Sequence, residues 1–173
     1  MKWVLRIGGF LLSLIILALL GLLAWGQRKD AGSFHAATEI SRPPEQVWPW
    51  MREPDKLKSW VSWLVEVRPD PSGSGAVWVM EDKNNGGALM EIHSQPEREE
   101  APRLLVLNTS APGGFAGHVT YLLTPTSSGT LIEQKSEFQF AMWMAKLFEP
   151  LITMSAEKKA KDDLAQLKAR VEK

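Results

Sequence analysis

The chain has 173 residues, which is the length of one domain with a short additional segment. Its 20 basic and 20 acidic residues balance, but every acidic residue lies at or after Asp30, so the chain beyond the N-terminal segment is mildly acidic. A mildly acidic body excludes a nucleic-acid partner held through phosphate contacts, which needs a basic face. The sequence contains no cysteine, which excludes disulfides, thiolate nucleophiles and cysteine-ligated metal sites.

The N-terminal segment is apolar from residue 7 to residue 25 and carries no charge there. As a helix it would be about 28 Å long, close to the roughly 30 Å of a bilayer's hydrocarbon core. Trp3 and Trp25 stand at its ends, and basic residues flank it on both sides: Lys2, Arg6, Arg28 and Lys29. We therefore predict a single-pass transmembrane anchor, with residues 1–33 as anchor and linker. A cytoplasmic N-terminus would place the remaining domain outside the cytoplasm.

A cleaved signal peptide is the alternative for this segment. It would combine the basic start and the apolar run with Ala24 and Gly26 as small residues near a cleavage point. The run is longer than the roughly 7–15 residues usual in such signals, and Trp25 fits poorly between the small residues. The pattern favours an uncleaved anchor.

Residues 34–173 show a change of periodicity along the chain. A strand is predicted at 34–41, followed by two short helices that begin near Pro43–Pro44 and at Pro54. From Leu64 the pattern has period two, with turn residues between the segments. Six more strands are predicted, at 64–69, 76–82, 88–94, 103–109, 118–124 and 130–140. Together the segments predict a seven-stranded antiparallel meander.

The last segment is predicted to be an amphipathic helix of about 20 residues that starts near Pro150. Its apolar face is expected to contain Leu151, Met154, Ala160, Leu164, Leu167 and Val171. Charged residues occupy the rest of the helix: Lys158, Lys159, Lys161, Asp162, Asp163 and Lys168. The apolar face should pack on the inner face of the sheet.

These elements, and one stretch in particular, carry a family resemblance. The stretch EISRPPEQVWPWMREPDKLKSW supplies Pro43, Pro44, Glu45, Val47, Trp48, Pro54, Asp55, Leu57 and Trp60. It resembles the START-like (SRPBCC) superfamily, in particular its polyketide cyclase/dehydrase-like branch, over residue 34 to the C-terminus. The resemblance implies an α+β helix-grip fold, in which a curved seven-stranded antiparallel sheet wraps on a long C-terminal helix. It also implies a cavity between the two.

Alternation along the strands selects candidate cavity walls. We predict that apolar side chains line the cavity, led by Trp78, Met80, Tyr121, Phe138 and Trp143. Large apolar residues on a half-buried sheet also form ordinary core, and that alternative stays open.

The titratable residues do not predict a catalytic, metal or cofactor site. His35, His93 and His118 lack the spacing of a metal site, and no serine stands in a nucleophile elbow. Glu91 and His93 could form an acid–base pair on one strand face, but a solvated polar face opposite Met90 and Ile92 explains them better. Asn84–Gly87 is a predicted hairpin turn and not a phosphate loop.

Three functions remain after these exclusions. The first is a membrane-anchored, non-catalytic domain that binds or carries a small hydrophobic molecule, lipid-like or aromatic, with the bilayer as its second partner. The second is a polyketide cyclase- or dehydratase-like enzyme. That function requires converging polar groups in the pocket, which the sequence does not reveal. The third is a tethered structural domain with a filled core.

Overall fold

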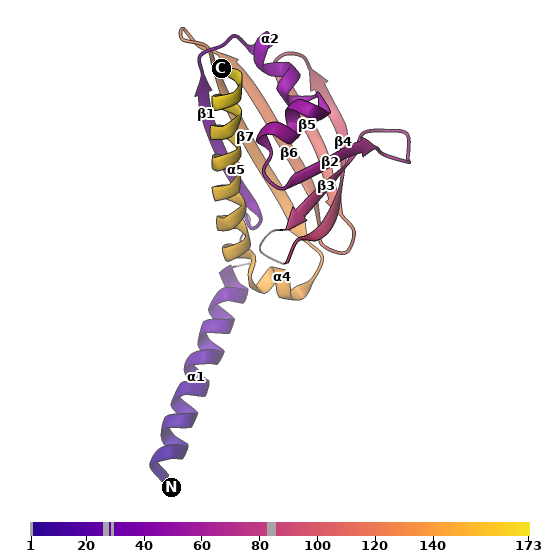
Figure 1. Cartoon of the computed structure of the whole chain (residues 1–173). Coiled ribbons are helices and arrows are strands. Elements are labelled where there is room, and N and C mark those ends of the chain that lie inside the picture. The colour runs from indigo at the N-terminus through magenta and orange to yellow at the C-terminus, as the bar shows by residue number, and fades with distance from the viewer. Residues whose placement is uncertain (1, 26–27, 29, 83–85) are drawn as a thin grey trace.

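A seven-stranded antiparallel sheet curves around one long helix in the computed structural model of the chain, which describes residues 2–25, 28, 30–82 and 86–173 (Figure 1). The long helix is α5 (Glu149–Val171), and a second helix, α1 (Lys2–Trp25), projects from one end of the domain. The seven strands and the helix against them confirm the predicted α+β helix-grip architecture.

The strands follow one another as a meander, except that the first strand closes the sheet beside the last. The order in the sheet is β1-β7-β6-β5-β4-β3-β2, and every neighbouring pair is antiparallel. The bounds are β1 (Ser33–Ile40), β2 (Leu64–Pro69), β3 (Ala76–Asp82), β4 (Ala88–Glu100), β5 (Leu104–Ala111), β6 (Phe115–Pro125) and β7 (Thr130–Phe140). Asn84 and Asn85 of the predicted β3–β4 turn lie outside the described residues.

Strand β4 corrects one predicted boundary. The sequence predicted a break at Pro96, but β4 continues to Glu100 with a register shift between Pro96 and Arg98. The last residue of β4 that pairs with β3 is Ser94, so Pro96 has a neighbouring strand on one side only. Proline has no amide hydrogen to donate to a neighbouring strand. It is therefore tolerated where a strand has a neighbour on one side only, particularly at a bulge.

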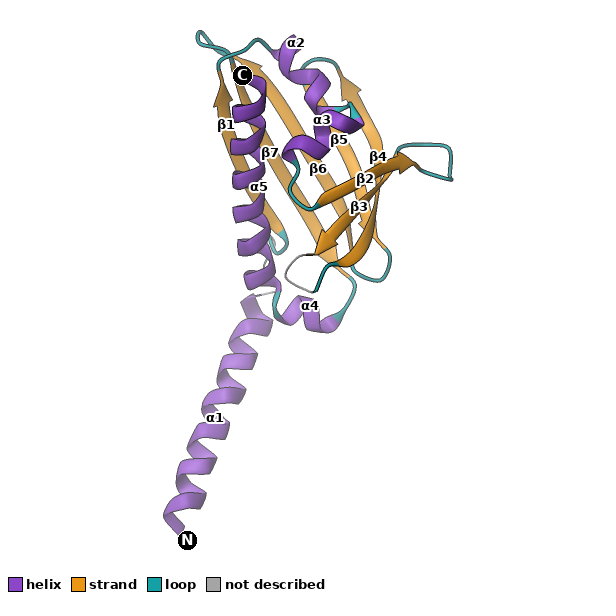
Figure 2. Ribbon diagram, in the orientation of Figure 1, coloured by secondary structure: helices purple, strands orange, loops and turns teal. Residues whose placement is uncertain are grey.

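Three short helical segments cross the open side of the sheet between β1 and β2 (Figure 2). They are α2 (Pro44–Val47), the 3₁₀ helix η1 (Trp48–Met51) and α3 (Pro54–Trp60). Each has a proline in its first turn, where the amide hydrogen that proline lacks would have no partner within the helix. The Trp60 indole nitrogen donates a hydrogen bond to the Trp50 carbonyl at 2.9 Å, which ties α3 to η1.

The buried face of α5 differs from the predicted one. Its buried residues include Glu149, Thr153, Ala160, Asp163, Leu164 and Leu167. Leu151 and Met154 are 59% and 67% exposed, so their assignment to the apolar face was wrong. From Ala160 to Leu167 the buried positions follow steps of three and four residues, as one face of a helix requires.

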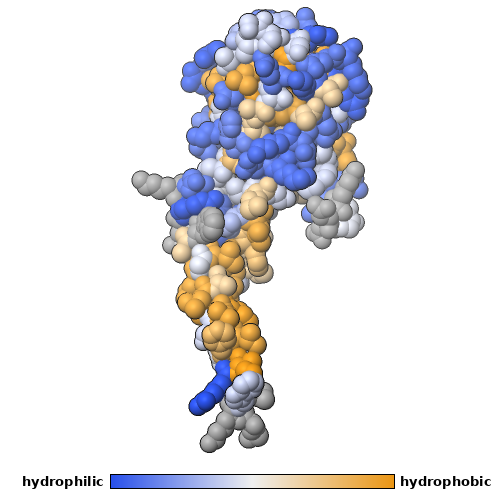
Figure 3. All heavy atoms as spheres, turned by 90° about the vertical axis from the view of Figure 1, so that its left-hand side faces the viewer, coloured by the Kyte–Doolittle hydropathy of each residue, from blue (hydrophilic) through white to orange (hydrophobic). Residues whose placement is uncertain are grey.

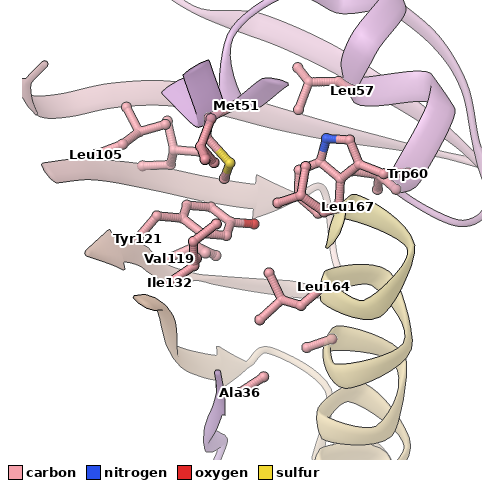
Figure 4. Packing of buried hydrophobic residues seen from close by; sticks show 14 of the residues in the cluster. Ala36, Met51, Leu57, Trp60, Leu105, Val119, Tyr121, Ile132, Leu164 and Leu167 are labelled. Carbon is pink, nitrogen blue, oxygen red and sulfur yellow. The ribbon is translucent and has the colours of Figure 1, made fainter. Parts of the chain in front are cut away.

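The core lies between α5, the short helices and the inner face of the sheet (Figure 4). Trp60 from α3 and Leu164 and Leu167 from α5 are almost fully buried. They pack with the fully buried strand residues Ile40, Leu105, Leu123 and Ile132. These side chains hold the helix against the far half of the sheet, away from α1.

Helix α1 extends away from the domain and exposes its apolar side chains (Figure 3). Phe10 is 66% exposed, and Leu11, Ile15 and Leu17 are also exposed. Within the residues that the structure describes, we find no helix that is both long and apolar enough to cross a membrane. Lys29, one of the predicted flanking charges, lies outside the described residues, and the membrane anchor stays a prediction.

A buried carboxylate binds two described residues that precede β1. Glu149, at the start of α5, is 1% exposed and accepts hydrogen bonds from the Gly32 amide at 2.6 Å and the Thr153 hydroxyl at 2.7 Å. Arg28 donates to the same carboxylate at 2.9 Å. Arg28 and Gly32 are therefore held against the first turn of α5.

Candidate functional site

A cavity of about 130 Å³ lies between the inner face of the sheet and the middle of α5. Strands β3 to β7 form its floor, α5 forms one wall, and the end of α3 closes it on the third side. The lining residues are Trp60, Val61, Trp78, Met80, Ile92, Thr109, Phe115, Val119, Tyr121, Gln134, Phe138, Lys159 and Asp163.

Four of the five predicted walls meet at this cavity. Trp78, Met80, Tyr121 and Phe138 all line it, from three different strands. Trp143 does not line it, because this residue begins the short helix α4 (Trp143–Leu147) and is 70% exposed. Whether the four residues contact a ligand stays a prediction.

Aromatic rings form the end of the cavity nearest to α4. The rings of Phe138 and Phe115 meet edge to face with centroids 5.0 Å apart, and Phe34 lies 5.9 Å from Phe138 on the other side. Gly117 makes room for this cluster, because a Cβ there would overlap the Glu137 carbonyl oxygen and stand 2.8 Å from the Phe138 ring. The glycine lets β6 and β7 approach closely where aromatic rings line the cavity.

The α5 wall is polar. Asp163 accepts hydrogen bonds from the Ser62 amide at 3.0 Å and the Ser62 hydroxyl at 2.5 Å, and the Lys159 ammonium lies 2.5 Å from its other oxygen. The ammonium also lies 5.5 Å from the centre of the Trp63 ring. Trp63 has a φ of 71°, a backbone conformation that is strained for a bulky side chain. These contacts hold an ion pair at the cavity edge.

Two further polar side chains reach the cavity from the sheet. Burial raises the pKa of the Tyr121 hydroxyl, and the nearby Asp163 carboxylate raises it further. Tyr121 is therefore a neutral hydroxyl at physiological pH, able to donate a hydrogen bond. The side-chain amide of Gln134 donates to Ser136 at 3.3 Å and also lines the cavity. The cavity thus combines an aromatic end with hydrogen-bonding groups.

A second hollow of about 230 Å³ lies beneath η1 and α3. Met51, Leu57 and Leu107 contribute apolar walls, and Trp78 lines both this hollow and the cavity against α5. Trp78 is therefore shared by two spaces on the same side of the sheet.

The histidines lie away from the cavity. His93 contacts Asp70 at 2.7 Å and His118 contacts Glu97 at 2.9 Å, both on the outer face of the sheet. Glu91 pairs with Arg68 on that outer face, as expected for a solvated polar surface. Hydrogen bonds from Ser72 and from His93 lower the pKa of Asp70 to about 2. Among the described residues, no group of His, Asp and Glu is arranged to hold a metal ion.

Lys159 and Asp163 are two charged site residues that the sequence pattern did not predict. Both were assigned to the solvated face of α5, although Asp163 is buried. A signal was available, because Asp163 lies three residues after Ala160 and four before Leu167, within the buried series. Asp163 was assigned to the solvated face because it is charged, although its position along the helix places it on the buried face.

Comparisons with known proteins agree with this architecture. The family described as polyketide cyclase/dehydrase and lipid transport matches residues 31–172. No curated protein matches the chain.

Solved structures share the fold at low sequence identity. Protein CV1439 from Chromobacterium violaceum is 17% identical with a TM-score of 0.66, over 82% of this chain and 98% of that one. Protein NE0264 from Nitrosomonas europaea is 18% identical with a TM-score of 0.64, over 83% and 96%. A conserved protein from Geobacillus kaustophilus is 12% identical with a TM-score of 0.67, over 80% and 94%. With its family match over most of its length, the chain belongs to the polyketide cyclase/dehydrase and lipid transport family.

Proposed function

We propose that this protein binds or carries a small hydrophobic molecule, lipid-like or aromatic, in the cavity between the sheet and α5, without catalysis. The observation that carries the proposal is the composition of the lining: Phe115, Phe138, Trp78 and Met80 supply apolar surface, while Tyr121 from the sheet and Lys159 from α5 offer hydrogen-bonding groups. Such a pocket suits a molecule with an apolar body and one polar end.

The volume limits the ligand. A cavity of about 130 Å³ accommodates one aromatic ring, whereas pockets for larger ligands occupy about 300–1,000 Å³. A shift of the Trp78 ring would join the cavity to the neighbouring 230 Å³ hollow, and the combined space reaches the lower end of that range. Trp78 is therefore the side chain whose position decides the size of ligand accepted.

We further propose that α1 anchors the protein in a membrane, with a cytoplasmic N-terminus and the domain outside the cytoplasm. Two features support this: α1 has 24 residues, and its apolar side chains from residue 7 to residue 20 are exposed. Apolar side chains left in water at this density are costly, whereas in hydrocarbon they are favourable. A bilayer location would also supply lipid-soluble ligands at high local concentration.

A cyclase- or dehydratase-like activity is the second candidate, supported by the Lys159–Asp163 pair at the cavity. Both oxygens of Asp163 already accept hydrogen bonds, from Ser62 and from Lys159. A carboxylate occupied in this way is a poor general base, so the arrangement favours binding over catalysis. Turnover of an aromatic polyketide that is lost in Asp163→Asn would reverse this preference.

Tryptophan fluorescence tests the binding proposal. Bromobenzene, an apolar single-ring molecule that quenches indole fluorescence, is titrated into the full-length protein in mild detergent. We expect a saturable quenched component that Trp78→Ala reduces, with Trp60, which also lines the cavity, giving the remainder. Trp143→Ala is the matched control and should retain it, because Trp143 is exposed and lies outside the cavity. Quenching that never saturates, or that both variants alter equally, would contradict binding at this cavity.

A further inference from the structure

Several strand ends lie together at the end of the sheet that is nearest to α1. Because all neighbouring strands are antiparallel, this end contains the end of β3, the start of β4, the β5–β6 hairpin, the start of β1 and the end of β7. Helix α4 follows β7 there and contacts α1 (Figure 1). The aromatic end of the cavity belongs to this end too, since Phe115 pairs with Phe140, the last residue of β7.

This end carries exposed apolar side chains that the fold does not need. They lie on α4, on the residue before it and on the first turns of α5, and we call them the apolar end surface: Met142, Trp143, Met144, Phe148, Leu151 and Met154. Each is between 42% and 70% exposed. A water-exposed surface rarely places so many large apolar side chains together unless they have a partner.

The position and composition of the surface indicate which partner. It is continuous with α1, whose exposed side chains are also apolar. Lys146 is exposed on α4 between the apolar residues, and Trp143 is among them. Tryptophan and lysine together favour the boundary between lipid and water, where the ring is half-immersed and the ammonium reaches the headgroups.

The described contacts place the apolar end surface next to α1. Helix α4, which carries Trp143 and Met144, contacts α1. The apolar end surface therefore lies beside the helix that we propose to be the membrane anchor. A second copy of the chain on this surface would have to compete with the membrane that α1 brings to it.

We propose that the apolar end surface inserts into the lipid–water interface and holds the aromatic end of the cavity against the bilayer. A hydrophobic ligand then passes between bilayer and cavity without crossing water. The inference rests on the proposed membrane anchor, and it adds a second, separate contact with the membrane.

Site-directed spin labels test this contact in the full-length protein, reconstituted in bilayer discs of phosphatidylcholine and phosphatidylglycerol. The chain has no cysteine, so single-cysteine variants carry one label each. The labelled positions are Met144→Cys on the apolar end surface, Leu14→Cys in α1 and Ser127→Cys at the β6–β7 turn, at the opposite end of the sheet. The readout is the ratio of relaxation by oxygen, which concentrates in lipid, to relaxation by a water-soluble nickel complex.

We expect the oxygen-to-nickel ratio at Met144→Cys to exceed the ratio at Ser127→Cys about tenfold, and Trp143→Ser in the same chain to lower it. A water-like ratio at Met144→Cys with a lipid-like ratio at Leu14→Cys would overturn this inference and leave the anchor standing. A water-like ratio at Leu14→Cys would overturn the anchor itself, and this inference with it.

Discussion

The two halves of the groove between the sheet and α5 are filled in opposite ways. In the half away from α1, Leu164 and Leu167 pack against Trp60 and the strand residues and are fully buried. In the half toward α1, the same helix presents Lys159 and Asp163 to a cavity, and then Leu151 and Met154 to the surface. One half of the grip therefore contains close-packed core, while the other half contains a cavity and exposed apolar surface.

The largest expected effect on stability comes from shortening a leucine side chain of α5 in the close-packed half of the groove. Leu167→Ala should lower the free energy of unfolding by about 2–5 kcal/mol, because it opens a cavity in a close-packed region. Leu151→Ala is the matched control on the same helix and should change it by less than about 0.5 kcal/mol, since Leu151 is exposed. Urea denaturation of the full-length protein measures both. Equal losses would mean that the halves do not differ.

Glu149→Gln tests the contacts that hold Arg28 and Gly32 against α5. Glutamine keeps the shape but weakens the bonds from Arg28, Gly32 and Thr153, so we expect a loss of about 1–3 kcal/mol. The control is Glu157→Gln, whose partner Lys161 is exposed, and its effect should be within about 0.5 kcal/mol. Chemical denaturation again provides the comparison, and a neutral Glu149→Gln would show that Arg28 and Gly32 are not held there.

Gly117→Ala probes the close approach that shapes the aromatic end of the cavity. The added methyl group would overlap the Glu137 carbonyl and the Phe138 ring, so we expect a loss of about 1–3 kcal/mol together with weaker bromobenzene quenching. Gly114→Ala serves as control, because its Cβ would meet its nearest neighbours at 3.6 Å, an ordinary contact. Similar stabilities for the two variants would contradict the role of Gly117 in the close approach of β6 and β7.

The smallest expected effect on stability is a dependence on pH, and it arises at Asp70, which lies outside both halves of the groove. The pKa of Asp70 is lowered to about 2, from an ordinary value near 4, by Ser72 and His93. A lowered folded-state pKa adds stability above pH about 4, and this stability is lost as the pH falls toward 2. Thermal melts of the native protein and Asp70→Asn should therefore differ slightly at pH 5 and converge near pH 2. A gap that widens with acid would reverse the assigned sign.

Binding should respond differently to pH. None of the three histidines lines the cavity, so affinity should change little between about pH 6 and 8. The pH dependence of stability and that of binding thus come from separate parts of the domain.

The fold followed from the sequence more fully than the site did. Alternation and turn residues predicted all seven strands, because a half-buried strand repeats every two residues. Pro96 was a misleading signal, since it lies on β4 beyond the point where β3 begins and has a neighbouring strand on one side only. Four cavity walls were predicted for the same reason as the strands, from their shared inner face.

The polar wall could not be predicted by composition. Asp163 is buried because Ser62 and Lys159 satisfy it, and Ser62 is 101 residues away in the chain. Trp143 was predicted to line the cavity, but it begins the short helix α4 and its side chain is exposed. Contacts between distant segments decide such positions, and periodicity within one segment does not contain them.

Native mass spectrometry of the full-length protein, extracted from membranes in mild detergent, tests the central claim most directly. We predict a bound hydrophobic molecule on the native chain and on Glu91→Trp, whose added ring lies on the outer face of β4. The neighbouring Ile92 lines the cavity, so Ile92→Trp should fill that space and lose the molecule. No bound molecule on the native chain, or equal retention by Ile92→Trp and Glu91→Trp, would contradict a ligand in this cavity.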